Sequence, residues 1–343
     1  MSDFSMTIQE ALNKVLDKVD LKEEEMISVM TQIMEGQAKD SQLGSFLTAL
    51  RIKGESIEEI AGAAIVMRDK AEKVKVATTA PIVDTCGTGG DGANTFNIST
   101  AAAFVVSGCG LAVAKHGNKA VSSLSGSADV LKCLGVNIDA DKGTVEKCLD
   151  EIGIGFLFAP MMHGAMKYAA GVRRELGFRT IFNLLGPLTN PAGANAQVIG
   201  IYDSSRLKQI ASVLELLGTR HAFVVHGNDG LDEITLTGET KVCELTNGQI
   251  KEYTLVPDSF GLSACKAEDL DGGTPEENAH IIKNILSGEE GPKRDIVLMN
   301  ASAAICAGEI AEDLKGAMRL ARESIDTGRA EKKLNDLCRL SHK

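Results

Sequence analysis

The chain has 343 residues, of which 44% are hydrophobic, and its formal net charge at pH 7 is −11. This length is sufficient to bury a large core and to form two domains. The acidic balance disfavours non-specific nucleic-acid binding, and no apolar run approaches the roughly 20 residues that span a bilayer.

The cysteines and the N-terminal residues favour a cytoplasmic protein. Eight cysteines form no C-x-x-C pair, and the six histidines show no metal-ligand spacing. This pattern argues against both a zinc site and a disulfide framework, and it indicates reduced thiols in a core. The first residues, MSDFSMTIQEALNKV, are polar and do not resemble a signal peptide.

The first 70 residues predict a small helical domain of about four helices. Apolar residues recur at helical spacing at Ile8, Leu12, Val15, Leu16 and Val19, and again at Leu43, Phe46, Leu47 and Leu50. Gly36 and Gly54 are well placed to end helices, and Ser56 with Glu59 forms a capping box. We expect this domain to cover residues 1–74.

After Pro81 the pattern changes to alternating strands and helices. The predicted strands are Ile82–Thr85, Leu111–Ala114, Gly155–Phe158, Val198–Tyr202 and Ala222–His226, and the predicted helices include Ser127–Leu134, Thr144–Ile152 and Ser205–Leu217. Continuous apolar strands with crossover helices predict a mostly parallel, buried sheet. From Pro275 onward, amphipathic helices are expected to cover it. The fold class is therefore α/β, with a large domain over residues 75–343.

A glycine-rich segment after the first predicted strand favours phosphate binding. Residues 87–92 read GTGGDG, and the next 36 residues contain no Asp or Glu, where the overall acid content predicts about five. That window also carries Lys115, His116 and Lys119. Glycine amides approach oxygen anions closely, and successive amides in a turn form an anion nest. The alternative is a simple strand-to-helix turn beside a chance gap in acids.

A dinucleotide site is a second interpretation of the same glycines. Gly87, Gly89 and Gly92 satisfy G-x-G-x-x-G after a predicted strand. That fingerprint requires a helix to open at once and an acid about 20 residues later. Instead ANTFN intervenes, Ser99 is the expected N-cap of the next helix, and position 112 is alanine. The sequence therefore disfavours NAD binding.

Two further segments are expected beside the glycine loop. KHGN (residues 115–118) also follows a predicted strand, and parallel sheets bind ligands beyond the carboxyl ends of their strands. After the strand at Ala222, the loop HGNDGLDEIT carries Asp232 and Glu233, adjacent carboxylates that can hold Mg²⁺ together with substrate phosphate oxygens. Taken alone, such an acidic pair is more often a solvated turn.

Six motifs resemble those of the anthranilate phosphoribosyltransferase family: DTCGTGGDG, NIST, KHGN, GSADVL, RTIFNLLGPLTNP and HGNDGLDEI. The resemblance runs over essentially the whole chain. It implies a nucleoside phosphorylase/phosphoribosyltransferase-like fold, with part of about 165–190 joining the small helical domain, and a homodimer through the helical domains. It implies no nucleic-acid or membrane partner.

The same resemblance implies the reaction. The family transfers 5-phosphoribosyl from phosphoribosyl pyrophosphate (PRPP) to anthranilate, giving N-(5-phosphoribosyl)anthranilate and pyrophosphate. This is the second step of tryptophan biosynthesis from chorismate, and two Mg²⁺ ions per active site are expected. No residue is assigned as general acid or base, because the aromatic amine is already neutral at pH 7. We expect His116 to stack or to position a ligand.

Carried over residue by residue, the resemblance implies three sets of site residues. Those implied to surround PRPP are Gly87, Gly90, Asp91, Thr95, Asn97, Ile98, Ser99, Thr100, Lys115, His116, Gly117, Asn118, Lys119, Ala120, Val121, Ser122, Ser123 and Ser127. Those implied to contact anthranilate are Gly87, Asn118, His163 and Arg173, and those implied to hold metal are Ser99, Asp232 and Glu233. A guanidinium can bind a carboxylate through two hydrogen bonds, although Arg173 could instead form a surface salt bridge with Glu175.

Two departures and two rival functions remain open at this point. Lys119 stands where the family commonly has Arg, and Lys132 where it commonly has Glu. Lysine at 119 keeps the positive charge but lacks the planar fork that binds a phosphate through two hydrogen bonds. One rival is a pyrimidine nucleoside phosphorylase, whose phosphate motifs differ from GTGGDG and KHGN. The other is a non-catalytic paralogue that binds nucleic acid, for which a basic stripe is expected.

Overall fold

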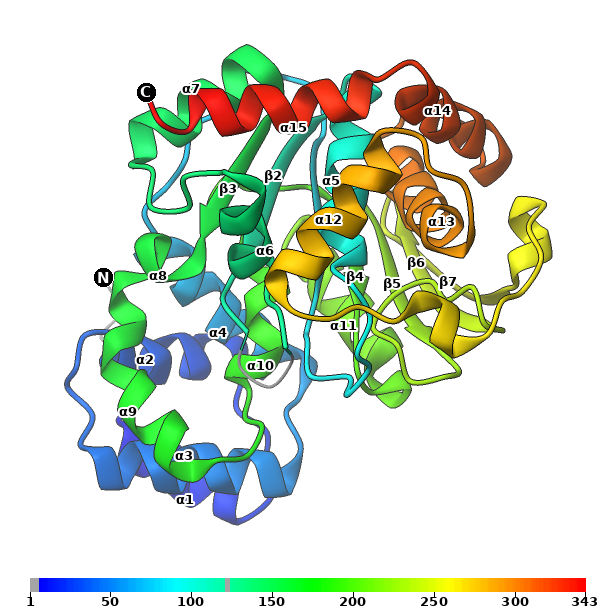
Figure 1. Ribbon diagram of the computed structural model, residues 1–343. Helices are drawn as coiled ribbons and strands as arrows, with labels where there is room; N and C mark the ends of the chain where they lie inside the picture. Colours follow the sequence, from blue (N-terminus) through cyan, green and yellow to red (C-terminus); the bar gives the residue numbers. More distant parts are fainter. Residues whose placement is uncertain (1–5, 121–123) are drawn as a thin grey trace.

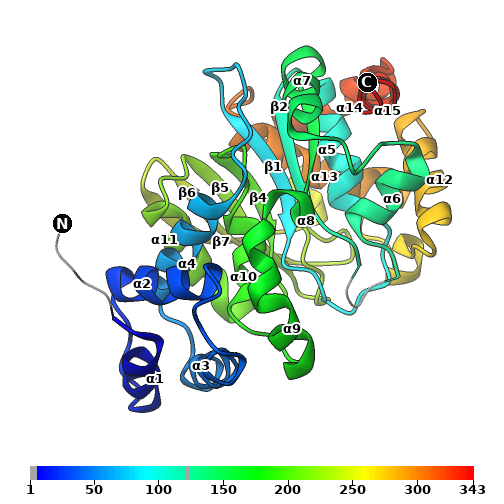
Figure 2. The ribbon, with the colours of Figure 1, turned by 90° about the vertical axis from the view of Figure 1, so that its left-hand side faces the viewer.

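The computed structural model describes residues 6–120 and 124–343, and it begins with a helical domain (Figure 1, Figure 2). Its helices are α1 (Ile8–Leu16), α2 (Glu23–Met34), α3 (Asp40–Lys53) and α4 (Ile57–Lys70). The capping box of Ser56 with Glu59 opens α4 as predicted, and Gly54 ends α3 at φ +88°. The predicted apolar stripe of α1 is only partly buried, because Leu16 and Val19 are 63% and 46% exposed.

The large domain is built on one seven-stranded sheet with the order β3-β2-β1-β4-β5-β6-β7. The strands are β1 (Ile82–Gly87), β2 (Ala112–Gly117), β3 (Ile154–Phe158), β4 (Ala196–Gly200), β5 (His221–Gly227), β6 (Thr240–Thr246) and β7 (Gln249–Leu255). The first five strands are mutually parallel, and β6 pairs antiparallel with both β5 and β7. The expected α/β class with a mostly parallel sheet is therefore confirmed.

The hairpin of β6 and β7 was not predicted. Its turn is formed by Asn247 and Gly248, both at positive φ (51° and 74°). An Asn-Gly pair with this backbone matches the right-handed twist of a two-residue hairpin. The signal was therefore present in the sequence, but the polar, exposed residues of β7 lack the apolar run that marks the buried strands.

Helices cover both faces of the sheet (Figure 1). They are α5 (Ile98–Gly108), α6 (Ser127–Leu134), α7 (Lys142–Ile152), α11 (Leu207–Leu216), α12 (Pro275–Leu286), α13 (Pro292–Ala307), α14 (Leu314–Asp326) and α15 (Arg329–Leu340). The expectation that Ser99 caps α5 was wrong. The cap position is Asn97, and Ser99 lies in the first turn, where its amide donates to Glu233. None of the helices in the described ranges is long and apolar enough to cross a membrane.

The middle of the chain returns to the helical domain. This segment holds α8 (Ala159–Met162), α9 (Lys167–Leu176) and α10 (Phe182–Leu185). Ala169 and Val172 of α9 share an apolar core with α1–α4, and Figure 2 shows α9 and α10 beside these helices. Short 3-10 turns complete the chain at Gly164–Met166, Gly186–Leu188, Ser204–Arg206, Pro257–Phe260 and Ala267–Leu270.

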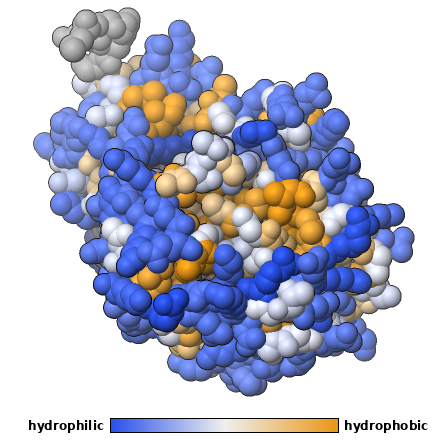
Figure 3. All heavy atoms as spheres, turned by 90° about the horizontal axis from the view of Figure 1, so that it is seen from above, coloured by the Kyte–Doolittle hydropathy of each residue, from blue (hydrophilic) through white to orange (hydrophobic). Residues whose placement is uncertain are grey.

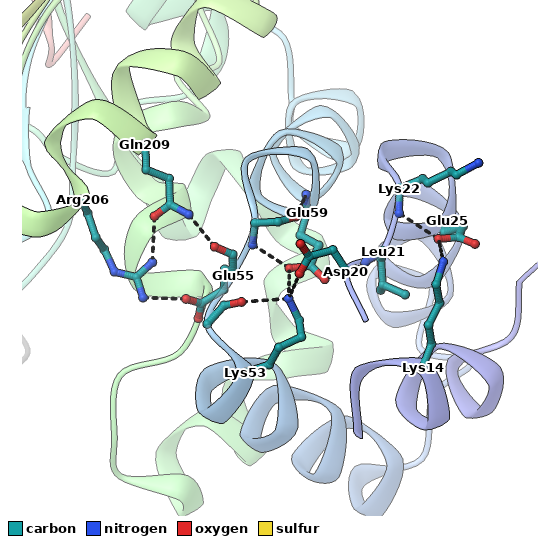
Figure 4. Close-up of polar contacts among 12 residues, drawn as sticks. Lys14, Asp20, Leu21, Lys22, Glu25, Lys53, Glu55, Glu59, Arg206 and Gln209 are labelled. Atoms are coloured by element: carbon teal, nitrogen blue, oxygen red, sulfur yellow. Dashed lines mark hydrogen bonds and ion pairs between the residues drawn. The ribbon is translucent and has the colours of Figure 1, made fainter. Parts of the chain in front are cut away.

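Buried polar contacts fix the helical domain against the sheet domain. Arg206 donates to the buried carboxylate of Glu55 at 2.7 Å, and Gln209 donates to the Glu55 carbonyl (Figure 4). On the same side, Arg68 of α4 donates to the Leu188 carbonyl at 2.7 Å.

The opposite end of the molecule, near α7, α14 and α15, has hydrophilic residues around its edge and apolar residues toward its middle (Figure 3).

Candidate active site

Three segments that are far apart in the sequence meet at the carboxyl ends of β1, β2 and β5. The amide of Gly89 donates to Asp232 Oδ2 at 2.8 Å, and the amide of Ser99 donates to Glu233 Oε1 at 3.1 Å. From β2, Lys115 Nζ donates to the Thr85 carbonyl at 2.6 Å. The glycine loop, the end of β2 and the acidic loop therefore share one region, as the sequence predicted.

Glycines allow these segments to pack backbone against backbone. A Cβ atom on Gly87 would lie 2.4 Å from Asp232 Oδ2, and one on Gly200 would lie 1.4 Å from the Asp232 carbonyl oxygen. Thr88 joins the glycine loop to the end of β4, because its amide donates to the Gly200 carbonyl at 2.9 Å. Any larger residue at 200 would displace the acidic loop.

The glycine loop has the backbone of an anion nest. Gly89, Gly90 and Gly92 have φ of +68°, +71° and +79°, a region that L side chains rarely adopt. Asp91 lies inside this loop and accepts the amide of Ala93 at 3.2 Å. Glycines let backbone amides approach oxygen anions without an intervening side chain, as phosphate-binding turns require.

A second loop follows β2 and is tied to the start of α6. The amide of Asn118 donates to Ser127 Oγ at 3.2 Å, and Asp129 Oδ2 accepts the amides of Ala120 and Gly126 at 2.9 and 3.0 Å. Gly117, Asn118, Lys119 and Ala120 thus form one tethered turn. Lys119 Nζ lies 5.8 Å from the Phe158 ring centroid. Three residues assigned to PRPP, Val121, Ser122 and Ser123, lie outside the described residues.

Only some atoms of the NIST segment, residues 97–100, are placed where a ligand could reach them. Asn97 donates to the Ser125 carbonyl at 3.0 Å, while Ile98 is buried in the apolar core, so only its backbone can reach a ligand. Thr100 Oγ1 is buried and has no hydrogen-bond partner among the described residues. Thr95, the other residue of this region assigned to PRPP, forms an isolated bridge with Asp271.

Burial and mutual repulsion disfavour the charged forms of the carboxyl groups in this region. Burial, together with the nearby charge of Asp91, raises the pKa of Asp232 to about 7. Burial and the charge of Asp232 raise the pKa of Glu233 well above its usual value. Burial lowers the pKa of Lys115, and the charges of Asp84 and Glu233 oppose that shift. Crowded acids of this kind are stabilised in their charged form by an added cation.

The donor set fits a magnesium ion that retains other ligands. Within the part of the chain that the structure describes, no group of three His, Cys, Asp or Glu side chains forms a complete metal site. Asp232 and Glu233 nevertheless supply carboxylate oxygens, and Ser99 Oγ lies 3.4 Å from Lys115 Nζ in the same region. Mg²⁺ commonly takes one or two carboxylates and fills its remaining positions with water and phosphate oxygens.

Two of the four residues assigned to anthranilate, His163 and Arg173, lie on the segment that returns to the helical domain, while Gly87 and Asn118 lie at the ends of β1 and β2. The Arg173 guanidinium lies 5.0 Å from the Phe182 ring centroid, and among the described residues it forms no ion pair. The alternative salt bridge with Glu175 is therefore not formed. The rings of His163 and His116 are 5.1 Å apart. Burial lowers the pKa of His163 to about 4 and that of His116 to about 3, so both are neutral at pH 7.

Arg179 is a residue that the sequence analysis did not assign. Its guanidinium donates to the Gly90 carbonyl and lies 3.6 Å from the Tyr202 ring centroid. It therefore connects the glycine loop to the segment that carries Phe182, on which Arg173 stacks. Arg179 begins the RTIFN motif, so the motif was visible, but nothing local in the sequence indicates a contact with a loop 89 residues away.

Comparison with known proteins gives a consistent result along the chain. Residues 9–71 match the helical bundle domain of a glycosyl transferase family, and residues 79–331 match the α/β domain of such a family. An anthranilate phosphoribosyltransferase from Geotalea uraniireducens is 51% identical, with 98% of this chain and 99% of the relative covered. One from Anaeromyxobacter sp. is 56% identical, covering 96% of this chain and 97% of the relative.

Solved structures agree with these relatives. A crystal structure of anthranilate phosphoribosyltransferase from Thermus thermophilus is 43% identical with a TM-score of 0.92, covering 97% of this chain and 99% of that chain. The Saccharomyces cerevisiae protein in complex with PRPP and Mg is 32% identical with a TM-score of 0.89, covering 98% of both chains. Another structure of the yeast protein, in complex with 4-fluoroanthranilate, is 30% identical with a TM-score of 0.87, covering 98% of both chains.

Proposed function

This chain belongs to the anthranilate phosphoribosyltransferase family and transfers 5-phosphoribosyl from PRPP to anthranilate, and we propose that its residues divide the work between a donor site and an acceptor site. The observation that carries this division is the meeting of the glycine loop, the end of β2 and the acidic loop. The products are N-(5-phosphoribosyl)anthranilate and pyrophosphate, and the reaction is a step of tryptophan biosynthesis.

In the proposed donor site, the diphosphate of PRPP binds between the two loops that follow β1 and β2. Amides of residues 87–92 and 117–120 donate to its oxygens, and Lys115 supplies a positive charge. As the bond from ribose C1 to diphosphate breaks, negative charge develops on the leaving group. Donors that are already oriented stabilise that charge without reorganising, which is the main source of rate acceleration expected here.

Magnesium is the cofactor, as the yeast complex with PRPP and Mg supports. We propose that Asp232, Glu233 and Ser99 hold two ions per active site, because burial raises the pKa of both carboxyl groups and an added cation would favour their charged forms. When bound, Mg²⁺ supplies Lewis-acid stabilisation of the departing diphosphate. Asp232 and Glu233 would orient the ions, and in this structure the same carboxylates accept the amides of Gly89 and Ser99.

In the proposed acceptor site, Arg173 binds the anthranilate carboxylate through two hydrogen bonds. Its guanidinium is free of ion pairs in the described structure and is oriented by Phe182. The anthranilate amine needs no base before it attacks ribose C1, since it is uncharged at pH 7, and the proton that it loses as the C–N bond forms passes to the departing pyrophosphate or to water. The neutral imidazoles of His116 and His163 act in positioning, together with Asn118 and Gly87, and they exchange no proton with the substrate.

The same reasoning extends to assembly and location. We propose domains of 1–74 and 75–343, with part of about 165–190 packed on the first, and a homodimer through the helical domains. Exposed apolar side chains at Leu16, Val19 and Ile52, the last 76% exposed, support that interface. Eight free cysteines support a reducing cytoplasmic location.

The dimer is tested by analytical ultracentrifugation of Ile52→Asp, which should sediment as a monomer while the wild type sediments as a dimer. A wild-type monomer would contradict the assembly.

The test of the assignment is a transfer assay with a matched variant. Anthranilate fluorescence should fall when PRPP and Mg²⁺ are both present, and it should stay constant when either is omitted. Asp232→Asn with Glu233→Gln should suppress turnover while the far-ultraviolet circular dichroism is unchanged, because these carboxylates serve metal rather than the core. Wild-type turnover in that double variant would refute their role, and phosphate-dependent cleavage of a pyrimidine nucleoside would favour the rival phosphorylase.

A further inference from the structure

The two strands that carry the phosphate loops separate before they end. β1 and β2 are paired only at Ile82 with Ala112 and at Val83 with Val113. β1 nevertheless stays paired with β4 as far as Gly87, and β2 stays paired with β3 as far as Gly117. From Asp84 onward the central ladder is therefore open, and the opening leads to the two proposed phosphate-binding loops.

The opening is bridged by side chains in place of backbone hydrogen bonds. Asp84, which is 0% exposed, accepts the amide of His116 at 3.2 Å through Oδ1 and the amide group of Asn190 at 2.8 Å through Oδ2. Asn190 Nδ2 also donates to the Ala114 carbonyl at 2.7 Å. From the other strand, Lys115 crosses to the Thr85 carbonyl at 2.6 Å. Each of these bonds joins a group of one strand to a group of the other, directly or through Asn190.

Burial raises the pKa of Asp84 and lowers that of Lys115, and the charge of each residue favours the charged form of the other. Lys115 is 4% exposed, and Asp84 is the acid whose charge most favours its charged form. Glu233 also favours it, but Glu233 is assigned to the metal. A buried cation needs a fixed counter-charge to keep its orientation, and a fully satisfied buried network rigidifies the groups that it connects.

We propose that Asp84, held by Asn190, is a positioning residue for PRPP binding. It keeps the carboxyl ends of β1 and β2 at the separation that admits a diphosphate, and it orients Lys115 between the loops. Asp84 is fully buried and lies on β1 before the glycine loop, so its effect passes through Lys115 and the backbone of His116. The proposal rests on the donor site proposed above.

The test is steady-state kinetics on Asp84→Asn. The new amide group meets the Asn190 amide group donor to donor, so one bond of the bridge is lost at nearly constant volume. We expect the KM for PRPP to rise about tenfold or more, as loss of a buried charge-assisted hydrogen bond predicts, while the KM for anthranilate stays within about twofold. Ser324→Ala is the control, since Ser324 is buried and donates to the Val105 carbonyl at 2.8 Å on α5, away from the loops. It should lower the melting temperature without changing either KM.

A swap of the two residues separates positioning from simple stability. Asn190→Asp alone brings two carboxylates together, whereas Asp84→Asn with Asn190→Asp restores a donor–acceptor pair and returns one carboxylate to the bridge. The double variant should therefore have a lower KM for PRPP than Asn190→Asp, but it does not regain the wild-type value, because a carboxylate at 190 cannot donate to the Ala114 carbonyl. If Asp84→Asn does not fold, Asn190→Ser should show the same selective rise in the KM for PRPP.

Two results would overturn the proposal. One is a folded Asp84→Asn protein whose KM for PRPP equals that of the wild type. The other is a parallel loss of stability and kcat with both KM values unchanged, as in a merely structural role. A wild-type protein without transfer activity would instead contradict the proposed function, so the two failures are distinguishable.

Discussion

Acidification should destabilise this protein through the buried pair of His116 and His163. Burial lowers their pKa values from 6.5 to about 3 and about 4. Because the unfolded chain binds these protons first, the stability contributed by the two neutral rings is complete above pH 6.5 and is lost as the pH falls toward the folded values. Each unit of pH below 6.5 costs about 1.4 kcal/mol per histidine, so at pH 5 the pair costs roughly 4 kcal/mol.

The assay is urea denaturation at pH 8 and pH 5, which reports the free energy of unfolding at each pH. His163→Gln removes one of the two groups, so its loss of stability between these pH values should be smaller than the wild-type loss by about 2 kcal/mol. His280→Gln is the control, because His280 is exposed on α12, and its loss should equal that of the wild type. Equal losses in the wild type and His163→Gln would show that protonation of His163 does not destabilise the fold.

Three substitutions test other parts of the site. Arg173→Ala should raise the KM for anthranilate about tenfold or more, while the KM for PRPP changes less than about twofold. Arg174→Ala is the control, because Arg174 is exposed. An equal rise in KM for both substrates would contradict the acceptor assignment. Gly200→Ala introduces a Cβ atom 1.4 Å from the Asp232 carbonyl oxygen, so the Mg²⁺ concentration for half-maximal activity should rise. Gly171→Ala is the control, because a Cβ atom there meets open space and should leave that concentration unchanged. An unaltered Mg²⁺ requirement in Gly200→Ala would be inconsistent with this packing. Arg179→Met removes the contacts with Gly90 and Tyr202, so the KM for PRPP should rise several-fold, and a wild-type value would show that the glycine loop is held without it.

The parts of the fold and site that follow from local sequence were predictable. The parallel strands are short apolar runs, and the glycine loop combines special backbone residues with a gap in acids, so both appear in a single pass along the chain. Asp232 and Glu233 were found because they follow a strand. Their contacts with the amides of Gly89 and Ser99 then depended only on where parallel strands end.

The remaining features depend on contacts between distant segments. Nothing near Arg179 indicates its contact with Gly90, and the buried bridge of Asp84 with Asn190 exists only because β1 and β2 separate. Serine is a residue type that favours the N-cap position, but the N-cap is Asn97 and the helix begins at Ile98. The amide of Ser99, inside the first turn, donates to Glu233. The family resemblance implied that Ile98 contacts PRPP, whereas packing turns its side chain into the core.

Anomalous diffraction from crystals grown with PRPP and Mn²⁺, a scattering substitute for Mg²⁺, would locate the metal ions and the diphosphate in one experiment. We expect anomalous peaks between the carboxylates of Asp232 and Glu233 and the diphosphate of PRPP, with that diphosphate lying against the amides of residues 87–92. Peaks elsewhere in the molecule, or a diphosphate bound away from both loops, would contradict it.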